Sequence, residues 1–308
     1  YIMSCYHKPM SIKKSNNCCL KLKQICVLFF LFISLFGFSQ ERSYQIYSSK
    51  GKKLSYIKFI KGLDRSEIIL FGELHNNPIC HWLQQEVIKS LLRSKDSKLV
   101  LGAEFFERDD QIIINEYLEG IIKLKHFKKE AKIWNNFDTD YEPLLKLAKE
   151  KNLEFIATNI PRRYASLVSR KGLSSLNELS DEAKSYMMPL PVKVDTSLKS
   201  YKAMLSMGHG MPMDPMNMLS AQAAKDATMA HFILKNYGAD KKFLHFNGSY
   251  HSDIYEGIYY WIQNYSSKDL IINTISTVEQ KDINKLDEEF LGRADYIICI
   301  DEDINKSY

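Results

Sequence analysis

The chain has 308 residues, 45% of them hydrophobic and 12% aromatic, which is enough apolar material for one large core. Its formal net charge of +5 comes from residues 1–40, which hold five lysines and no acidic residue. With those five subtracted, 37 basic and 37 acidic residues remain. A balanced chain without a basic tract lacks the electrostatic footprint of a nucleic-acid-binding protein.

Residues 1–40 have the pattern of an export signal. Lys21 and Lys23 precede the apolar run ICVLFFLFISLFGF, residues 25–38, which is shorter than the roughly 20 residues that span a bilayer. We therefore expect a signal peptide over 1–40, a mature domain over 41–308, and a protein exported to the periplasm or cell envelope. An uncleaved membrane anchor is the alternative. A lipid anchor is not indicated, because Cys26 lies at the start of the apolar run rather than after it.

Strand-like and helix-like segments alternate along the remaining chain. The segment 44–48, followed by Gly51, predicts an edge strand or hairpin. Runs rich in β-branched and aromatic residues recur at 68–71, 99–105, 153–158, 243–246, 270–275 and 296–300, and helical patterns lie at 79–93, 141–151, 221–237 and 253–264. This alternation predicts βαβ units, and strands that are apolar throughout are typical of a sheet covered on both faces. We expect an α/β fold with a mostly parallel β-sheet flanked by helices.

Two segments, 106–150 and 172–219, are longer than one crossover helix requires. Both have mostly helical patterns, as in ERDDQIIINEYLEGI and SSLNELSDEAKSYMM. We expect them to form a smaller helical subdomain inserted over the sheet.

Ionisable and amide side chains accompany the ends of four predicted strands. They are Glu73 and His75 after the first, Glu104 and then Arg108 at the second, Asn159, Arg162 and Arg163 after the third, and Asn247 and His251 after the fourth, with His245 inside that strand. In open α/β sheets ligands bind beyond the carboxyl ends of the strands, so we expect these groups to meet around one crevice. A single such residue is more often a turn or cap. Four strand ends together indicate a binding or catalytic site.

The tetrapeptides GELH, residues 72–75, and GSYH, residues 248–251, repeat one pattern at two strand-to-helix junctions. A glycine at such a junction lets the backbone approach a ligand closely. Paired imidazoles with a glutamate form a ligand set that divalent metals use. Either Glu73 or Glu104 could supply the carboxylate, and we take His75, His251 and Glu104 as the candidate metal ligands.

The helix AQAAKDATMAHFI places Gln222 and Asp226 four residues apart, on a stripe that apolar residues continue. An amide and a carboxylate on an inward stripe need partners, and Arg162 or Arg163 could supply one. A capping or surface pair is the alternative.

Five motifs in order, GELH, AEFFER, TNIPRR, AQAAKDATMA and HFNGSYH, resemble the ChaN-type haem-binding uptake proteins of the Tiki/TraB/erythromycin-esterase superfamily. The likeness runs from about residue 66 to about residue 265. It implies a parallel-sheet α/β domain with a smaller helical domain, and haem binding for iron acquisition with envelope transport components as partners. The implied functional residues are Glu73, His75, Glu104, Arg162 or Arg163, Gln222, Asp226 and His251. The family can hold haem iron by tyrosine, for which Tyr250 and Tyr201 are candidates.

The stretch MLSMGHGMPMDPMNM, residues 204–218, carries six methionines around a histidine, and its glycines and prolines predict a loop. Its candidate binding residues are Met207, His209, Met211, Met213 and Met216. Thioethers form an adaptable apolar surface and are soft ligands for Cu(I). A lid or haem contact, plain packing and a copper site are therefore all open.

Two functions compete for the strand-end residues. The first is haem binding, with Arg162 and Arg163 as carboxylate partners for the propionates. The alternative is a metal-dependent hydrolase, an esterase or protease, in which a bound metal lowers the pKa of a water and a glutamate acts as general base. Its catalytic residues would be Glu73, His75, Glu104 and His251. We favour haem binding, because the likeness is to the ChaN branch and the methionine-rich stretch suits an apolar ligand.

Overall fold

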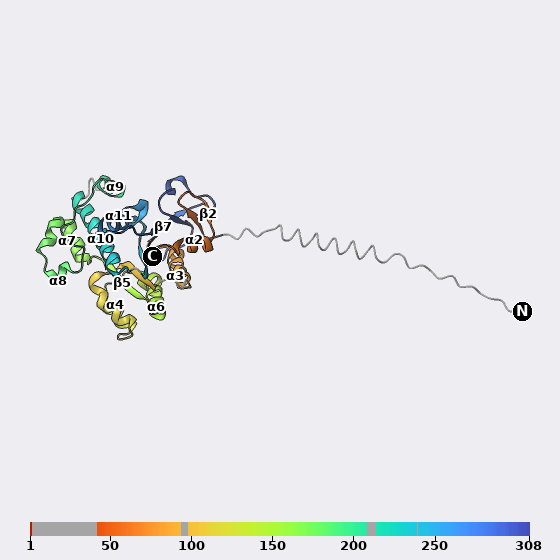
Figure 1. Cartoon of the computed structure of the whole chain (residues 1–308), viewed down its shortest axis with the longest axis horizontal. Helices are drawn as coiled ribbons and strands as arrows, with labels where there is room; N and C mark the ends of the chain where they lie inside the picture. The colour runs from red at the N-terminus through yellow and green to blue at the C-terminus, as the bar shows by residue number, and fades with distance from the viewer. Residues whose placement is uncertain (2–41, 94–97, 208–213, 239) are drawn as a thin grey trace. The chain divides into compact units, whose positions relative to one another are not determined.

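The described residues between 42 and 308 form an eight-stranded sheet with the order β2-β1-β8-β7-β3-β6-β4-β5. Figure 1 shows the helices arranged around this sheet. The strands are β1 (Tyr44–Ser48), β2 (Lys53–Leu54), β3 (Ile68–Glu73), β4 (Lys98–Glu107), β5 (Glu154–Asn159), β6 (Lys241–Gly248), β7 (Ile272–Gln280) and β8 (Tyr296–Asp301). The β1 strand runs antiparallel to β2 and β8, and every other neighbouring pair is parallel. The predicted α/β fold with a mostly parallel sheet is therefore confirmed.

This computed structural model describes residue 1 and residues 42–93, 98–207, 214–238 and 240–308. The predicted signal peptide, and His209, Met211 and Met213 of the methionine-rich stretch, lie outside the described residues. Among the residues that are described, no helix has both the length and the apolar character needed to cross a membrane.

Helices connect the strands and cover both faces of the sheet. They are α2 (Tyr56–Leu63), α3 (Pro78–Leu91), α4 (Gln111–Leu118), α5 (Leu124–Glu130), α6 (Glu142–Glu150), α7 (Arg162–Lys171), α8 (Asp181–Lys184), α9 (Lys199–Met207), α10 (Pro215–Asn236) and α11 (Ile258–Tyr265). A π-helical turn, Phe137–Tyr141, precedes α6, and 3-10 turns include Arg108–Asp110, Leu173–Glu178, Ser249–His251, Asp253–Tyr255 and Glu288–Phe290. Helices and helical turns therefore make up most of the segment 106–150, whereas in the segment 172–219 the residues 185–198 form no helix.

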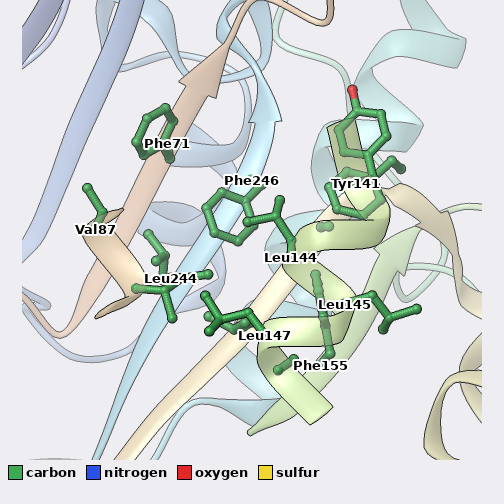
Figure 2. Packing of buried hydrophobic residues seen from close by; sticks show 14 of the residues in the cluster. Phe71, Val87, Tyr141, Leu144, Leu145, Leu147, Phe155, Leu244 and Phe246 are labelled. Carbon is green, nitrogen blue, oxygen red and sulfur yellow. The ribbon is translucent and has the colours of Figure 1, made fainter. Parts of the chain in front are cut away.

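Each face of the sheet has its own hydrophobic core. Alternate residues of β3 belong to different clusters: Ile69 and Phe71 to one, Ile68 and Leu70 to the other. In the first cluster the leucines of α6 pack against side chains of β5 and β6 (Figure 2). The second holds α7, α10 and α11 against the opposite face. This double coverage explains why the central strands are apolar throughout.

Two helix starts differ from the predictions for local chemical reasons. The methionine-rich stretch is not a loop throughout, because α9 continues to Met207 and α10 begins at Pro215. Proline suits the first helical position, and the Asp214 carboxylate caps α10 by accepting from the Met216 amide at 2.7 Å. The last helix begins at Ile258 rather than 253, because Ile254 and Gly257 have φ angles of 54° and 55°.

Candidate functional site

The strands β3, β6, β4 and β5 are parallel neighbours in this spatial order. Their carboxyl ends therefore lie side by side along one edge of the sheet. Glu73 ends β3, Asn159 ends β5, and Asn247 is the penultimate residue of β6. Glu104 lies within the register irregularity that falls between Ala103 and Glu107 in β4. A bulge of this kind re-aims the side chains beside it. The structure therefore brings the predicted strand-end residues to one rim.

The carboxylate of Glu73 is buried, with 2% of the residue exposed. It accepts hydrogen bonds from His75 Nδ1 at 2.9 Å, from the Tyr141 hydroxyl at 2.7 Å and from the Gln84 amide. Burial alone would raise its pKa, but His81 and His75 outweigh burial and hold the pKa below its ordinary value. Glu73 is therefore an ionised group that fixes the His75 ring.

His75 stands on the rim with 38% of its side chain exposed. Its Nδ1 faces Glu73, the edge of its ring packs against Trp134 with centroids 5.0 Å apart, and its Nε2 lies against Gly248. Burial acts to lower the pKa of His75, but the hydrogen bond and charge of Glu73 raise it. A histidine whose Nδ1 is held by a carboxylate presents Nε2 in a fixed direction, as metal-binding histidines do.

Five residues that brace this half of the site were missed from the sequence. They are His81 and Gln84 on α3, and Asn136, Asp140 and Tyr141 at the π-helical turn. The His75 backbone carbonyl accepts from Asn136 Nδ2 at 2.8 Å and from His81 Nε2 at 3.1 Å. The spacing of three between His81 and Gln84 was an available signal, because such residues share a helix face. The π-helical turn left no sequence signal that we can identify.

His251 forms the second half of the site, buried between two carboxylates. Its Nε2 lies 3.1 Å from Glu104 Oε1, and its Nδ1 forms a close hydrogen bond with Asp226 Oδ1. Both partners accept, so both ring nitrogens donate and the ring is an imidazolium. Burial alone would lower its pKa, but Glu104 and Asp226 raise it to about 10. The same imidazolium, aided by the Gly248 amide at 2.7 Å, holds the pKa of Glu104 well below its usual range against the effect of burial.

Asp226 and Gln222 reach this cluster from α10. Asp226 Oδ2 accepts the Tyr201 hydroxyl at 2.8 Å, and the Gln222 side-chain amide lies 2.9 Å from His251 Nδ1. Because Nδ1 is protonated, the amide oxygen is the group that can accept from the ring at this position. The prediction that Arg162 or Arg163 would partner these residues was wrong. The inward stripe of α10 faces the histidine after β6, whereas both arginines begin α7, which follows β5.

The arginines lie at a different part of the rim. Arg163 pairs with Asp109, and Arg162, whose side chain is 76% exposed, has its Nε 3.9 Å from Glu107 Oε1. Both line a hollow of about 460 Å³. Arg108 has a structural role, because its guanidinium covers the Phe232 ring at 4.4 Å.

Asn159, Asn247 and His245 brace the strand ends from inside. Asn159 Nδ2 donates to the Glu104 carbonyl at 3.0 Å, and Asn247 Nδ2 donates to Ser252 Oγ at 3.0 Å. His245 is fully buried beside the Thr158 hydroxyl, 2.7 Å from its Nε2, and burial lowers its pKa to about 4. It is therefore a neutral core histidine.

The two histidine clusters meet at Gly248. A Cβ there would lie 2.7 Å from His75 Nε2 and 3.5 Å from Glu104 Oε2. The absent side chain lets the His75 ring pack onto the backbone after β6. Tyr250 follows two residues later, 43% exposed, with its hydroxyl donating to the Ser200 carbonyl at 2.9 Å.

The structure gives no support to the predicted metal set of His75, His251 and Glu104. Within the described ranges, no three or more His, Cys, Asp or Glu side chains are grouped so as to hold a metal ion. Both ring nitrogens of His251 are engaged by carboxylates, Nε2 by Glu104 and Nδ1 by Asp226. The hydrolase alternative, which needs that metal, is not favoured.

Comparison with known proteins identifies the family and the fold of this chain. The sequence profile of the family described as "Haem-binding uptake, Tiki superfamily, ChaN" matches residues 59–262. ChaN of Campylobacter jejuni, solved with cofacial haem binding, shares the fold with a TM-score of 0.63 and 20% identity, over 84% of this chain and 97% of that one.

A curated relative, the chloroplastic protein RETICULATA-RELATED 5 of Arabidopsis thaliana, is 26% identical over 199 residues. The match takes in 60% of this chain, which spans about a quarter (26%) of that relative's length. The family profile covers most of the chain, including both histidine clusters. The chain therefore belongs to the ChaN family of haem-binding uptake proteins within the Tiki superfamily.

Proposed function

We propose that this chain binds haem at its strand-end cluster and serves haem or iron acquisition at the cell envelope. Family membership supports haem as the ligand, and the signal-like pattern of residues 1–40 supports export. The observation that carries the proposal is the state of His75: partly exposed, held by Glu73 through Nδ1, and free of hydrogen bonds to the described residues at Nε2.

A haem site needs an iron ligand at an accessible surface, together with groups that suit the porphyrin and its propionates. His75 meets the first requirement, and the Trp134 ring beside it supplies aromatic surface. Arg162 supplies an exposed guanidinium on the same rim for a propionate. The residues present therefore fit haem, which would supply an iron centre at this site.

The two tyrosine candidates for the iron ligand differ in their exposure to solvent. Tyr201 is 1% exposed and its hydroxyl donates to Asp226, so it is closed to a ligand. Tyr250 is exposed next to the position where His75 packs, and it is the second candidate for the iron.

Haemin titration tests this proposal. The wild type should give a Soret shift that saturates at a small whole-number ratio. His75→Ala should lower the affinity by about tenfold or more and change the spectrum, because one iron ligand is lost. His126→Ala removes an exposed histidine on α5 and should titrate like the wild type.

Tyr250→Phe distinguishes the two iron ligands. A wild-type spectrum in Tyr250→Phe assigns the iron to His75, whereas a loss confined to Tyr250→Phe assigns it to the tyrosine. A featureless, non-saturating response from the wild type would contradict haem binding itself.

A further inference from the structure

The segment 302–308, which follows β8, returns to the loop that carries His75. It lies outside residues 59–262, which the family profile matches, so its role follows from its contacts alone. Because β8, β7 and β3 are parallel neighbours, the chain leaves β8 at the edge of the sheet where Glu73 ends β3. Ile304 anchors the segment by packing against the hydrophobic cluster that also holds the α6 leucines.

Ser307 makes two hydrogen bonds to the surroundings of His75. Its backbone amide donates to the carbonyl of Asn76, the residue next to His75, at 2.9 Å. Its hydroxyl donates to Asp140 Oδ2 at 2.6 Å, and Asp140 belongs to the π-helical turn before α6. A single residue of the segment is therefore bonded both to the His75 loop and to the π-helical turn that braces it.

Asp140 connects the Ser307 hydroxyl to the backbone of His75. Its carboxylate is buried, and the Oδ2 atom also accepts from Asn136 Nδ2 at 2.7 Å and lies 3.7 Å from His81 Nε2. Asn136 Nδ2 and His81 Nε2 are the two groups that donate to the His75 carbonyl. A buried carboxylate orients the donors around it, because leaving an oxygen unpaired costs free energy. A continuous chain of hydrogen bonds therefore runs from Ser307 through Asp140 to His75.

Lys306 adds an ion pair beside these bonds. Its ammonium contacts the carboxylate of Glu279 on β7, which accepts from Asn77 Nδ2 at 2.6 Å. Asn77 is fully buried, and its side-chain oxygen caps α3 by accepting from the Cys80 amide at 3.0 Å. The ion pair is partly exposed, so its own contribution to stability is small. Its effect is to hold the carboxylate that fixes the start of α3.

We propose that the segment 302–308 is a strap that positions His75, acting through the bonds of Ser307 to Asn76 and Asp140. The His75 ring is 38% exposed, and its Nδ1 lies 2.9 Å from Glu73. Movement of the loop backbone would therefore change the direction of Nε2. A ligand side chain needs such support, because binding geometry has to hold within about 0.5 Å. The positioning concerns the unliganded protein, and its consequence for haem affinity rests on the proposed function.

NMR of the unliganded protein tests the strap without haem. Ser307→Ala removes the hydroxyl bond to Asp140 and should shift or broaden the ring resonances of His75. The Asn77 amide closes the loop by donating to the Leu74 carbonyl at 3.0 Å. Its hydrogen exchange should become about tenfold faster, the effect of losing one hydrogen bond to a charged group. Ser307→Thr keeps a hydroxyl and should restore both observations.

Haemin titration of the same variants extends the test to the proposed ligand. Ser307→Ala should lower the haemin affinity by about tenfold, the lower end of the effect of removing a group that orients a metal ligand. Ser307→Thr should titrate like the wild type. Asn305→Ala is the matched control, because it changes an exposed residue of the same segment that makes none of these contacts.

Each outcome supports or overturns the strap. Altered His75 resonances in Ser307→Ala that Ser307→Thr restores support it, and they do so even if the wild type fails to bind haemin, a result that would defeat the proposed function alone. The same resonances with unchanged haemin affinity would keep the strap and take His75 out of the haem site. Wild-type His75 resonances in Ser307→Ala would overturn the inference, because a segment that only adds stability lowers the melting temperature and leaves the ring in place. Equal changes in Asn305→Ala would also overturn it.

Discussion

Replacing Gly248 with alanine perturbs the point where the two histidine clusters meet. The glycine has φ −54° and ψ 139°, angles that alanine adopts without strain. The new Cβ would lie 2.7 Å from His75 Nε2 and 2.9 Å from its Cε1. These atoms end a partly exposed side chain, so the ring swings aside while the backbone stays in place. Gly248→Ala should therefore displace His75 without disrupting the sheet.

The free-energy consequences follow from the bonds that change. His75 loses its 2.9 Å hydrogen bond to Glu73, whereas Glu73 keeps the Tyr141 hydroxyl and the Gln84 amide. Because the His75 ring is 38% exposed, the lost bond contributes about 1 kcal/mol to stability rather than the larger value of a buried charged pair. The melting temperature should fall by about 2–4 °C. The haemin affinity should fall by about tenfold or more, since the proposed iron ligand is moved.

Thermal unfolding and haemin titration of the same preparations provide the assay. Gly238→Ala is the matched control, because its Cβ would meet no atom closer than 3.5 Å among the described neighbours. If Gly248→Ala bound haemin with the affinity and spectrum of Gly238→Ala, the position assigned to His75 in the haem site would be refuted.

Two further substitutions probe the buried charges and the sheet edge. The pKa of His251 is raised to about 10, so its ion pairs stabilise the fold fully below about pH 6.5 and lose this effect as pH rises through 10. Urea unfolding at pH 7 and pH 10 should therefore show a larger loss of stability in the wild type than in His251→Gln, and equal losses would contradict the assignment of this charge. The Gln111 amide bonds the Phe155 carbonyl at 2.9 Å and the Ala157 amide at 2.8 Å along the outer edge of β5. Gln111→Ala should cost about 1–2 kcal/mol of unfolding free energy with unchanged haemin affinity; a change in affinity with no change in stability would contradict this structural role.

Continuous apolar runs in the sequence were sufficient to locate the parallel strands, because strands buried on both faces are apolar throughout. The six predicted runs correspond to β3 through β8, and the segment 44–48 pairs with β2 as an antiparallel edge. The strand boundaries were less predictable. The β4 strand continues to Glu107, past a register irregularity that follows Ala103. Its end was not predictable, because polar residues that serve the site interrupt the apolar pattern there.

The strand-end rule located the candidate site, but it could not assign partners within it. Asp226 lies on α10, whose rotation and height over the sheet are set by tertiary packing, so its bond to His251 had no local signature. Asp140 and Tyr141 reach the site through a π-helical turn, a conformation that depends on long-range contacts. The histidines of GELH and GSYH share the same spacing from a glycine, but they differ in burial and in charge. His75 is on the rim, whereas His251 is a buried imidazolium.

A crystal structure of the protein with bound haemin tests the central claim most directly. We expect the porphyrin at the carboxyl ends of β3 and β6, with His75 Nε2 bound to iron. Haem held at another surface, such as the hollow that Gln111 and Phe155 line at the edge of β5, would contradict it.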